Sequence, residues 1–334
     1  MKNRFALHSP SVLLGSGVRP CSPVKRSRSA LPMNSSVLSD ITDRLTRISD
    51  TPGLDASVLI GNVIKKPRTW VMAHPGITLT SEQQSDLNAA LERLERGESF
   101  PYVIGHWEFF GLDFEITSDV LIPRPETELL VEKAIGWLQA SPERRPSSPL
   151  RVADVGTGSG AIAVALAMHV RDVYILATDN SLPALRVAKR NADKFGVASR
   201  IDFVNCDLLP PCPHPRPLSQ NRERGAEGGV RAYFDLICAN LPYIPTETLR
   251  GLKVFGREPA LALDGGDDGF STIRRLLQIA PKWLAPNGRL LLEIEASLGM
   301  RALGLAYDSF SSAEIQLHQD LSGQDRLLEI QLRD

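Results

Sequence analysis

The chain has 334 residues, of which 43% are hydrophobic and 23% are charged, and its formal net charge is −1. This length allows one large domain or two smaller ones, the balanced charge gives no overall basic field that would attract nucleic acid, and no apolar run reaches the roughly 18–20 residues of a membrane span. The four cysteines form no C-x-x-C pair and the six histidines do not cluster, so we predict no metal site. From the balanced charge and the absence of a long apolar run, we also predict no direct nucleic-acid partner and no membrane insertion.

The N-terminal segment has an unusual composition. The first 39 residues contain no Asp or Glu, and six basic residues are scattered among Ser and Pro. This composition resembles an organelle transit peptide. A disordered tail, or a start codon placed too early with Met33 as the true start, explains it as well. We predict that residues 1–36 are such a tail and that the protein is cytoplasmic, with organelle targeting as the alternative.

Residues 37–105 are predicted to form a small helical domain. Apolar residues recur at three and four positions over 38–48, which is the period of a helix. A second helix is predicted over 55–64. A third begins at Thr80-Ser81, with Thr80 or Ser81 as the N-cap and Glu or Gln close behind it. Gly97 is a plausible C-cap for this helix.

The chain then changes its period. The aromatic-rich segment 107–116 predicts two short strands around Gly111, and we assign residues 106–119 as a β-hairpin linker. From residue 120 to 334, buried strands alternate with helices, which predicts an α/β domain with a parallel sheet covered on both faces. The last two strands should form an antiparallel hairpin at one edge. The predicted elements are a strand, glycine turn and helix over 150–170, further strands at 173–179, 201–207, 234–240, 289–295, 313–319 and 326–332, and helices at 182–196 and 272–288.

One segment breaks this alternation. Residues 208–233 are rich in Pro, Gly and Arg, show no periodicity and cannot build a packed core. We predict a flexible insert between the third and fourth strands. A basic docking loop is the alternative, although the acidic Glu223 and Glu227 reduce its net positive charge.

A glycine loop after the first strand predicts an adenosine site. Glycines let the backbone approach a ligand closely, and the helix that follows offers free N–H groups. Asp179 ends the next strand, where a carboxylate can accept hydrogen bonds from both ribose hydroxyls, and Asp207 ends the third strand and could meet the adenine edge. The cofactor-binding residues predicted in the loop are Asp154, Gly156, Thr157, Gly158, Ser159 and Gly160.

The glycines alone do not choose between two cofactors. Gly156, Gly158 and Ala161 satisfy the G-x-G-x-x-A pattern of nicotinamide dinucleotide sites. Asp154 supplies the acidic residue that often precedes the loop of an S-adenosyl-L-methionine site.

The segment Asn240-Leu-Pro-Tyr243 predicts chemistry on an amide or aromatic amine. The fourth strand should lie next to the first, so Asn240 lies beside the glycine loop at the carboxyl edge of the sheet and is both a catalytic and a cofactor-site candidate. The side-chain oxygen of Asn240 and the backbone carbonyl of Leu241 can accept the two N–H bonds of a planar nitrogen and stabilise the charge that develops during methyl transfer. Pro242 biases Leu241 to an extended shape, and the Tyr243 ring can pack on the flat acceptor.

These motifs resemble a known family. Asn-Leu-Pro-Tyr is similar to the Asn-Pro-Pro-Tyr motif of S-adenosyl-L-methionine-dependent methyltransferases that act on planar nitrogens. Further segments resemble, in the same order, the protein-(glutamine-N5) methyltransferases that modify peptide chain release factors (the HemK/PrmC family). The resemblance extends over 37–334 apart from the insert, and its segments are 100–116, 120–132, 154–167, 240–245 and 258–270.

The resemblance implies a fold, a cofactor and a partner. It implies a Rossmann-like, seven-stranded class I methyltransferase sheet, S-adenosyl-L-methionine as methyl donor, and the Gln of a release factor's Gly-Gly-Gln loop as acceptor. The helical domain would help to bind the release factor, and we expect a monomer. It further implies that Arg124, Glu126 and Thr127 border the cofactor pocket, and that Glu258 and the turn at Asp264 lie near the acceptor.

The chain departs from the family pattern at two motifs and in its insert and basic N-terminal tail, and four alternatives remain. Leu241 stands where the family has its first proline, which leaves the backbone carbonyl in place, and 293–299 lacks the usual Gly and Gln. The alternatives are a ribosomal-protein glutamine N5-methyltransferase, a nucleic-acid adenine N6-methyltransferase, a nicotinamide-dependent oxidoreductase and a non-catalytic adaptor. An adenine methyltransferase should carry a basic recognition domain, and residues 37–116 are not notably basic.

Overall fold

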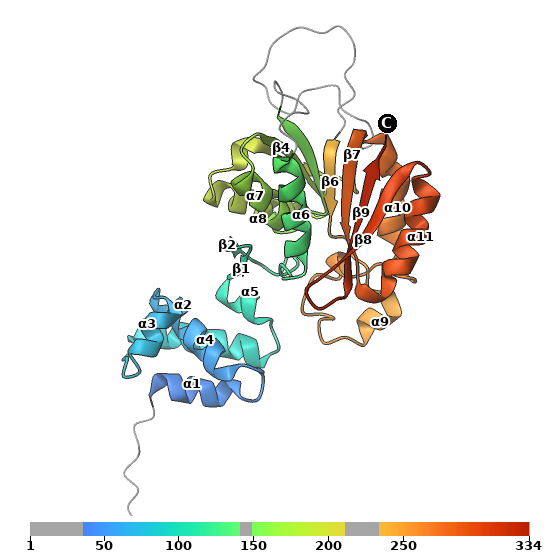
Figure 1. Ribbon diagram of the computed structural model, residues 1–334. Coiled ribbons are helices and arrows are strands. Elements are labelled where there is room, and N and C mark those ends of the chain that lie inside the picture. The colour runs from blue at the N-terminus through green and yellow to red at the C-terminus, as the bar shows by residue number, and fades with distance from the viewer. Residues whose placement is uncertain (1–35, 141–148, 211–233, 334) are drawn as a thin grey trace, which may run out of the picture.

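The computed structural model describes residues 36–140, 149–210 and 234–333. A helical part at the N-terminal end is joined by a short hairpin to a larger α/β part (Figure 1). The helices of the N-terminal part are α1 (Val37–Leu45), α2 (Pro52–Ile64), α3 (Arg68–Ala73), α4 (Ser81–Glu95) and α5 (Phe100–Ile104).

The N-terminal helices pack around their own apolar core. Leu59 and Ile60 of α2 and Leu87 and Leu91 of α4 are completely buried there. The predicted cap at Thr80 is confirmed: its hydroxyl accepts a hydrogen bond from the backbone N–H of Gln83, and the Gln83 side chain accepts one from the Thr80 N–H. This capping box satisfies two backbone donors that the first turn of α4 leaves unpaired.

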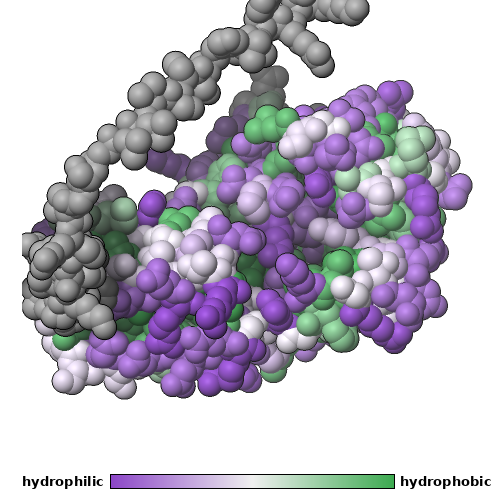
Figure 2. Space-filling view, turned by 90° about the horizontal axis from the view of Figure 1, so that it is seen from below, coloured by the Kyte–Doolittle hydropathy of each residue, from purple (hydrophilic) through white to green (hydrophobic). Residues whose placement is uncertain are grey.

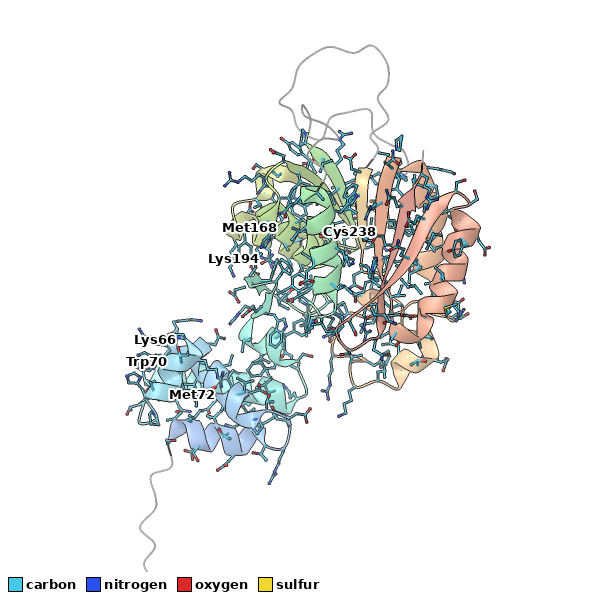
Figure 3. All side chains as sticks on the ribbon, in the orientation of Figure 1. Lys66, Trp70, Met72, Met168, Lys194 and Cys238 are labelled. Carbon is cyan, nitrogen blue, oxygen red and sulfur yellow. The ribbon has the colours of Figure 1, made fainter. Side chains whose placement is uncertain are left out.

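A two-stranded hairpin connects the two parts. Strands β1 (His106–Phe109) and β2 (Leu112–Glu115) pair antiparallel. The two turn residues, Phe110 and Gly111, both have positive φ, +52° and +70°, as a tight type I′ turn requires. The hairpin is attached to helix α8 (Leu182–Lys194), where the ammonium group of Lys194 lies 2.9 Å from the carboxylate of Asp113 (Figure 3).

The α/β part is built on a seven-stranded sheet, and the predicted fold class is confirmed. The strand order is β5-β4-β3-β6-β7-β9-β8. The first five strands in this order are parallel, and β9 and β8 form the predicted antiparallel edge. The strands are β3 (Leu150–Val155), β4 (Val173–Asp179), β5 (Ile201–Asn205), β6 (Phe234–Ala239), β7 (Leu284–Glu293), β8 (Ala313–Gln319) and β9 (Asp325–Leu332).

Helices cover both faces of this sheet (Figure 1). Successive strand residues point to opposite faces, so Val152 of β3 belongs to the core beneath α6, α7 and α8, whereas Ala153 and Val155 belong to the core beneath α10 and α11. A fully buried sheet needs apolar residues on both sides, which is why its central strands read as continuous apolar runs. The helices are α6 (Thr127–Gln139), α7 (Ala161–His169), α9 (Thr246–Arg250), α10 (Ser271–Ile279) and α11 (Gly299–Ser309), in addition to α8.

Several boundaries differ from the sequence prediction. The helix predicted over 272–288 ends at Ile279, and strand β7 begins at Leu284 instead of 289. Pro281 has no N–H to continue the helix, and a 3₁₀ turn over Ala280–Lys282 redirects the chain. Strand β5, the third strand of this sheet in chain order, ends at Asn205, so the prediction that it ends at Asp207 is wrong.

Helix α11 was not predicted. Gly299 and Gly304 lower its intrinsic helix propensity, and small residues such as Ala302 and Ala306 form its buried side. Its formation therefore depends on packing against the sheet more than on a strong helical pattern of apolar residues.

Some predictions concern segments outside the described residues. They are the tail before Ser36 and all of the insert beyond residue 210. Among the helices that the structure does describe, none combines the length and apolar character needed to cross a membrane.

Candidate active site

The carboxyl ends of the parallel strands border a cavity of about 250 Å³. The register pairs Val155 at the end of β3 with Thr178 of β4 on one side and Ala239 of β6 on the other. The loops that follow these three strands therefore meet at one edge of the sheet, where ligands bind in such folds. Of the predicted site residues, the cavity is lined by Gly156, Gly158, Asp179, Asp207, Asn240, Leu241 and Pro242.

The glycine loop fits closely against its neighbours. Gly156 has a φ of +75°, and a Cβ atom at this position would lie 3.1 Å from Cδ2 of Leu241. Gly160 has a φ of +82°, and a Cβ atom there would lie 3.1 Å from the Cα of Ala188 in α8. Glycine is required at both positions, because a side chain would strain the backbone and push the loop away from its neighbours. The loop therefore keeps its backbone open toward the cavity, as the binding of a nucleoside demands.

Asp179 lies at the end of β4 and holds the loop. Its carboxylate accepts hydrogen bonds from the backbone N–H of Gly158, at 2.9 Å, and of Ser181, at 2.8 Å. Burial raises the pKa of Asp179, and these backbone hydrogen bonds oppose the rise. Each carboxylate oxygen retains a further lone pair, so Asp179 can accept hydrogen bonds from ribose hydroxyls while it fixes the glycine loop.

Asp154 is buried behind the loop rather than exposed to the cavity. Its carboxylate accepts hydrogen bonds from the Thr157 hydroxyl, at 2.6 Å, and from the backbone N–H of Ala163 in the first turn of α7, at 3.1 Å. Burial raises the pKa of Asp154 to about 7. The backbone carbonyl of Ser159 accepts a hydrogen bond from Asn191 of α8. Among the predicted cofactor residues, Asp154, Thr157, Ser159 and Gly160 thus support the loop from behind.

Asp207 lies at the rim of the cavity beside a residue that the sequence analysis missed. Its carboxylate forms an ion pair with the guanidinium of Arg275 in α10, and both residues line the cavity. No pattern in the sequence pointed to Arg275, because α10 is distant in the chain and its arginines resemble an ordinary solvent-exposed face. Val120 and Leu121 also line the cavity and were not among the predicted site residues.

Asn240 is held by a residue from another element. Its side-chain Nδ2 donates a hydrogen bond to the hydroxyl of Thr127, the first residue of α6, at 3.0 Å. Thr127 is buried and does not line the cavity, so it contacts the site through Asn240. Because Nδ2 is engaged in this way, Oδ1 is the Asn240 atom that can accept hydrogen bonds from a ligand.

The rest of the Asn-Leu-Pro-Tyr segment packs against two glycine turns, with the Leu241 side chain next to Gly156 and the Tyr243 main chain next to Gly265. Leu241 is only 4% exposed. The main chain of Tyr243 lies against the Gly265 turn, where a Cβ atom would come within 2.8 Å of the Tyr243 Cα. Asp264 stabilises this turn by accepting hydrogen bonds from Thr246 and Gly266. The turn at Asp264 therefore supports the segment from behind.

Glu258 binds the Pro-Arg-Pro segment, residues 123–125, which follows the cavity residues Val120 and Leu121. Its buried carboxylate pairs with the guanidinium of Arg124, at 2.6 Å, and accepts a hydrogen bond from the backbone N–H of Ile122. Burial raises the pKa of Tyr243, and Arg124 and Glu126 are among the charges near its ring. The structure thus brings Arg124, Glu126 and Thr127 to the Asn240 side of the site, although none of them lines the cavity itself.

The fold and the site together define a class of enzyme. A parallel sheet with an antiparallel edge, a glycine loop after β3, a carboxylate at the end of β4 and an Asn-Leu-Pro-Tyr segment after β6 form a class I methyltransferase. Its methyl donor is S-adenosyl-L-methionine, which resolves the choice of cofactor that the glycines left open.

Comparisons with known proteins narrow this class to one family. A family model described as "PrmC N-terminal domain" matches residues 36–105, and one described as "Methyltransferase small domain" matches residues 138–214. A release factor glutamine methyltransferase of Coxiella burnetii is 36% identical, covering 86% of this chain and 95% of its own length. Another from Moorella thermoacetica is 37% identical, covering 83% of this chain and 90% of its own length. The chain belongs to the family of release factor glutamine methyltransferases.

One solved structure of this type is also similar. The release factor-specific protein-(glutamine-N5) methyltransferase from Alicyclobacillus acidocaldarius is 26% identical and has a TM-score of 0.38. The match covers 66% of this chain and all of that chain.

Proposed function

We propose that this chain methylates the side-chain amide nitrogen of the Gln in the Gly-Gly-Gln loop of peptide chain release factors. The names of its curated relatives support the substrate. One observation carries the chemistry: the Asn240 amide is oriented by Thr127 at 3.0 Å, and its oxygen remains available beside the cofactor cavity.

The acceptor nitrogen needs help because its lone pair is delocalised into the amide. S-adenosyl-L-methionine supplies the electrophilic methyl group. We assign the Asn240 Oδ1 and the Leu241 carbonyl as acceptors for the two N–H bonds of the substrate amide, which orients it and stabilises the positive charge of the transition state. The Leu241 side chain supports this geometry, because it packs against Gly156 of the cofactor loop. Pro242 restricts Leu241 to extended conformations.

We assign cofactor binding to the glycine loop and the carboxylate next to it. Asp179 would accept hydrogen bonds from the ribose hydroxyls, and the backbone of Gly156 and Gly158 would contact the ligand. Asp154 would act indirectly, since it fixes the loop to the start of α7. Asp207 and Arg275 would border the base.

We assign the helical domain of residues 37–105 to recognition of the release factor. It is coupled to the site through Tyr102 of α5, whose hydroxyl donates a 2.6 Å hydrogen bond to the carbonyl of Val120, a residue of the cavity wall. Figure 2 views the end of the molecule where α9 lies and shows mainly hydrophilic side chains, with apolar residues in separate patches. Such a mixed surface suits a partner that must dissociate after each turnover.

The direct test uses S-adenosyl-L-methionine with a labelled methyl group. The acceptors are a release factor, the same factor with its loop Gln replaced by Ala, a preparation of ribosomal proteins and a DNA duplex that contains adenine. We expect label in the first alone. Equal labelling of the two factors would refute the proposal, and preferential labelling of ribosomal protein or DNA would favour the corresponding alternative. The Asn240→Ala variant serves as the inactive control.

A further inference from the structure

Glu293 is a buried carboxylate beside the active site that the mechanism above does not use. It is the last residue of β7 and is 2% exposed. The parallel register pairs Ala239 of β6 with Leu292 of β7, so the next residues, Asn240 and Glu293, leave neighbouring strands at the same edge. Within the described part of the chain, Oε2 of Glu293 has no hydrogen-bond partner. A buried carboxylate in this state is costly and suggests a function.

The hydroxyl of Thr127 connects Glu293 to Asn240. This hydroxyl accepts a hydrogen bond from Nδ2 of Asn240, and it is also the hydrogen-bond partner that lowers the pKa of Glu293. A hydroxyl has one proton to donate. Because an ionised carboxylate can only accept, the arrangement in which that proton points to Glu293 leaves the hydroxyl oxygen to accept from Asn240.

We propose that Glu293 is a positioning residue for methyl transfer, which through the Thr127 hydroxyl keeps Nδ2 of Asn240 turned inward and Oδ1 turned toward the acceptor amide. The proposal rests on the function assigned to Asn240 above. If Glu293 carried a proton, it could donate to Thr127, and Thr127 could then donate to Oδ1. The Asn240 amide would flip and present its NH₂ group to the NH₂ group of the substrate, so the acceptor would lose a hydrogen-bond partner.

The charges around Glu293 place this switch near neutral pH. Burial is the largest influence and raises the pKa of Glu293 to about 7, and Glu126 at the start of α6 adds to the rise. Arg326 of β9 and Arg124 of the Pro-Arg-Pro segment oppose it, as does the hydrogen bond from Thr127. Tyr243 also faces the carboxylate. Turnover should therefore increase as the pH rises through about 7 and Glu293 loses its proton.

The test compares turnover with pH at saturating cofactor and release factor. Wild-type kcat should rise between roughly pH 6 and 8, the range around the Glu293 pKa. Glu293→Gln should reduce kcat roughly 10- to 100-fold at pH 8, as expected when a reacting group is misplaced, and should remove this rise. Thr127→Val should show the same loss, and Thr127→Ser, which keeps the hydroxyl, should recover most of it. Cofactor affinity measured by calorimetry should be unchanged in all three variants, which also verifies that they fold.

Two outcomes separate this inference from the proposed function. A Glu293→Gln variant with wild-type kcat and wild-type pH dependence would overturn the inference while leaving the methylation of release factors intact. The second measurement needs no acceptor: the side-chain ¹⁵N–H₂ resonances of Asn240 should shift with an apparent pKa of about 7 in the wild type and should not do so in Glu293→Gln. Asp154 has a similar pKa but remains in both proteins. Identical NMR titrations would refute the inference even if no release factor were methylated.

Discussion

The replacement of Glu293 by Gln should stabilise the protein at alkaline pH while it lowers activity. The pKa of Glu293 rises from 4.5 to about 7 in the folded state because the side chain is buried. The folded state therefore binds the proton more tightly than the unfolded chain does. The resulting stabilisation is fully present below about pH 4.5 and is lost progressively as the pH rises to about 7. Gln does not titrate, so the variant escapes this loss.

The magnitude follows from the size of the shift. At 1.36 kcal/mol per pKa unit, raising the carboxyl pKa from 4.5 to about 7 corresponds to roughly 3 kcal/mol, of which roughly 2–3 kcal/mol falls between pH 5 and pH 8. Relative to the wild type, the free energy of unfolding of Glu293→Gln should therefore increase by about that amount between these two pH values. Comparing the two proteins cancels the contribution of Asp154, which titrates in both.

The assay is urea denaturation of both proteins at pH 5 and pH 8, followed by tryptophan fluorescence. Glu132→Gln is the matched control, since Glu132 is exposed on α6 and its variant should behave alike at both pH values. A difference between wild type and Glu293→Gln that does not change with pH would refute the reasoning. A variant that is both more stable and less active would show that the buried charge is kept for function.

Three further predictions concern the reacting groups. Asn240→Ala should lower kcat at least about 100-fold with little change in the cofactor Kd, because it removes a transition-state contact; retained turnover would show that Asn240 is only structural. Asp179→Ala should weaken cofactor binding roughly 10- to 100-fold in calorimetry through lost charged hydrogen bonds, and an unchanged Kd would mean that another residue binds the ribose. In parallel kinetic assays, Leu241→Pro should lower kcat less than Pro242→Ala, since the first keeps the backbone carbonyl of residue 241 in place and the second lets its orientation vary. A larger loss of kcat in Leu241→Pro would contradict the role of this carbonyl.

Much of the fold could be predicted because its signals are local. The strands β4 and β8 match their predicted residues, since short apolar or alternating runs bounded by turns are read directly from the sequence. The glycine loop and Asn240 were also apparent, because they follow buried strands at the edge where ligands bind. The boundary of α10 and the existence of α11 were missed, since each depends on packing against the sheet more than on a periodic pattern.

The contacts between distant parts of the chain at the site could not be predicted from the sequence. Asp207 was correctly associated with the cavity, but its ion pair with Arg275 joins residues 68 positions apart. In the sequence, residues 293–299 stand out only as a departure from the family pattern. A charged residue at the end of the buried run of β7 was the available signal for Glu293.

The sequence by itself determined the order of the elements, the glycines that permit positive φ at the cofactor loop, and the choice of Asn240 and Leu241 as candidate acceptors. Each of these follows from the conformational limits and hydrogen-bonding groups of neighbouring residues. The tertiary structure alone decided that Thr127 of α6 binds Asn240 after β6, and that Glu293 at the end of β7 lies at the same edge of the sheet. The direction of the Asn240 amide depends on a hydrogen-bond chain across three elements, and burial sets the pKa of the carboxylate at its end. Both are properties of the packed environment.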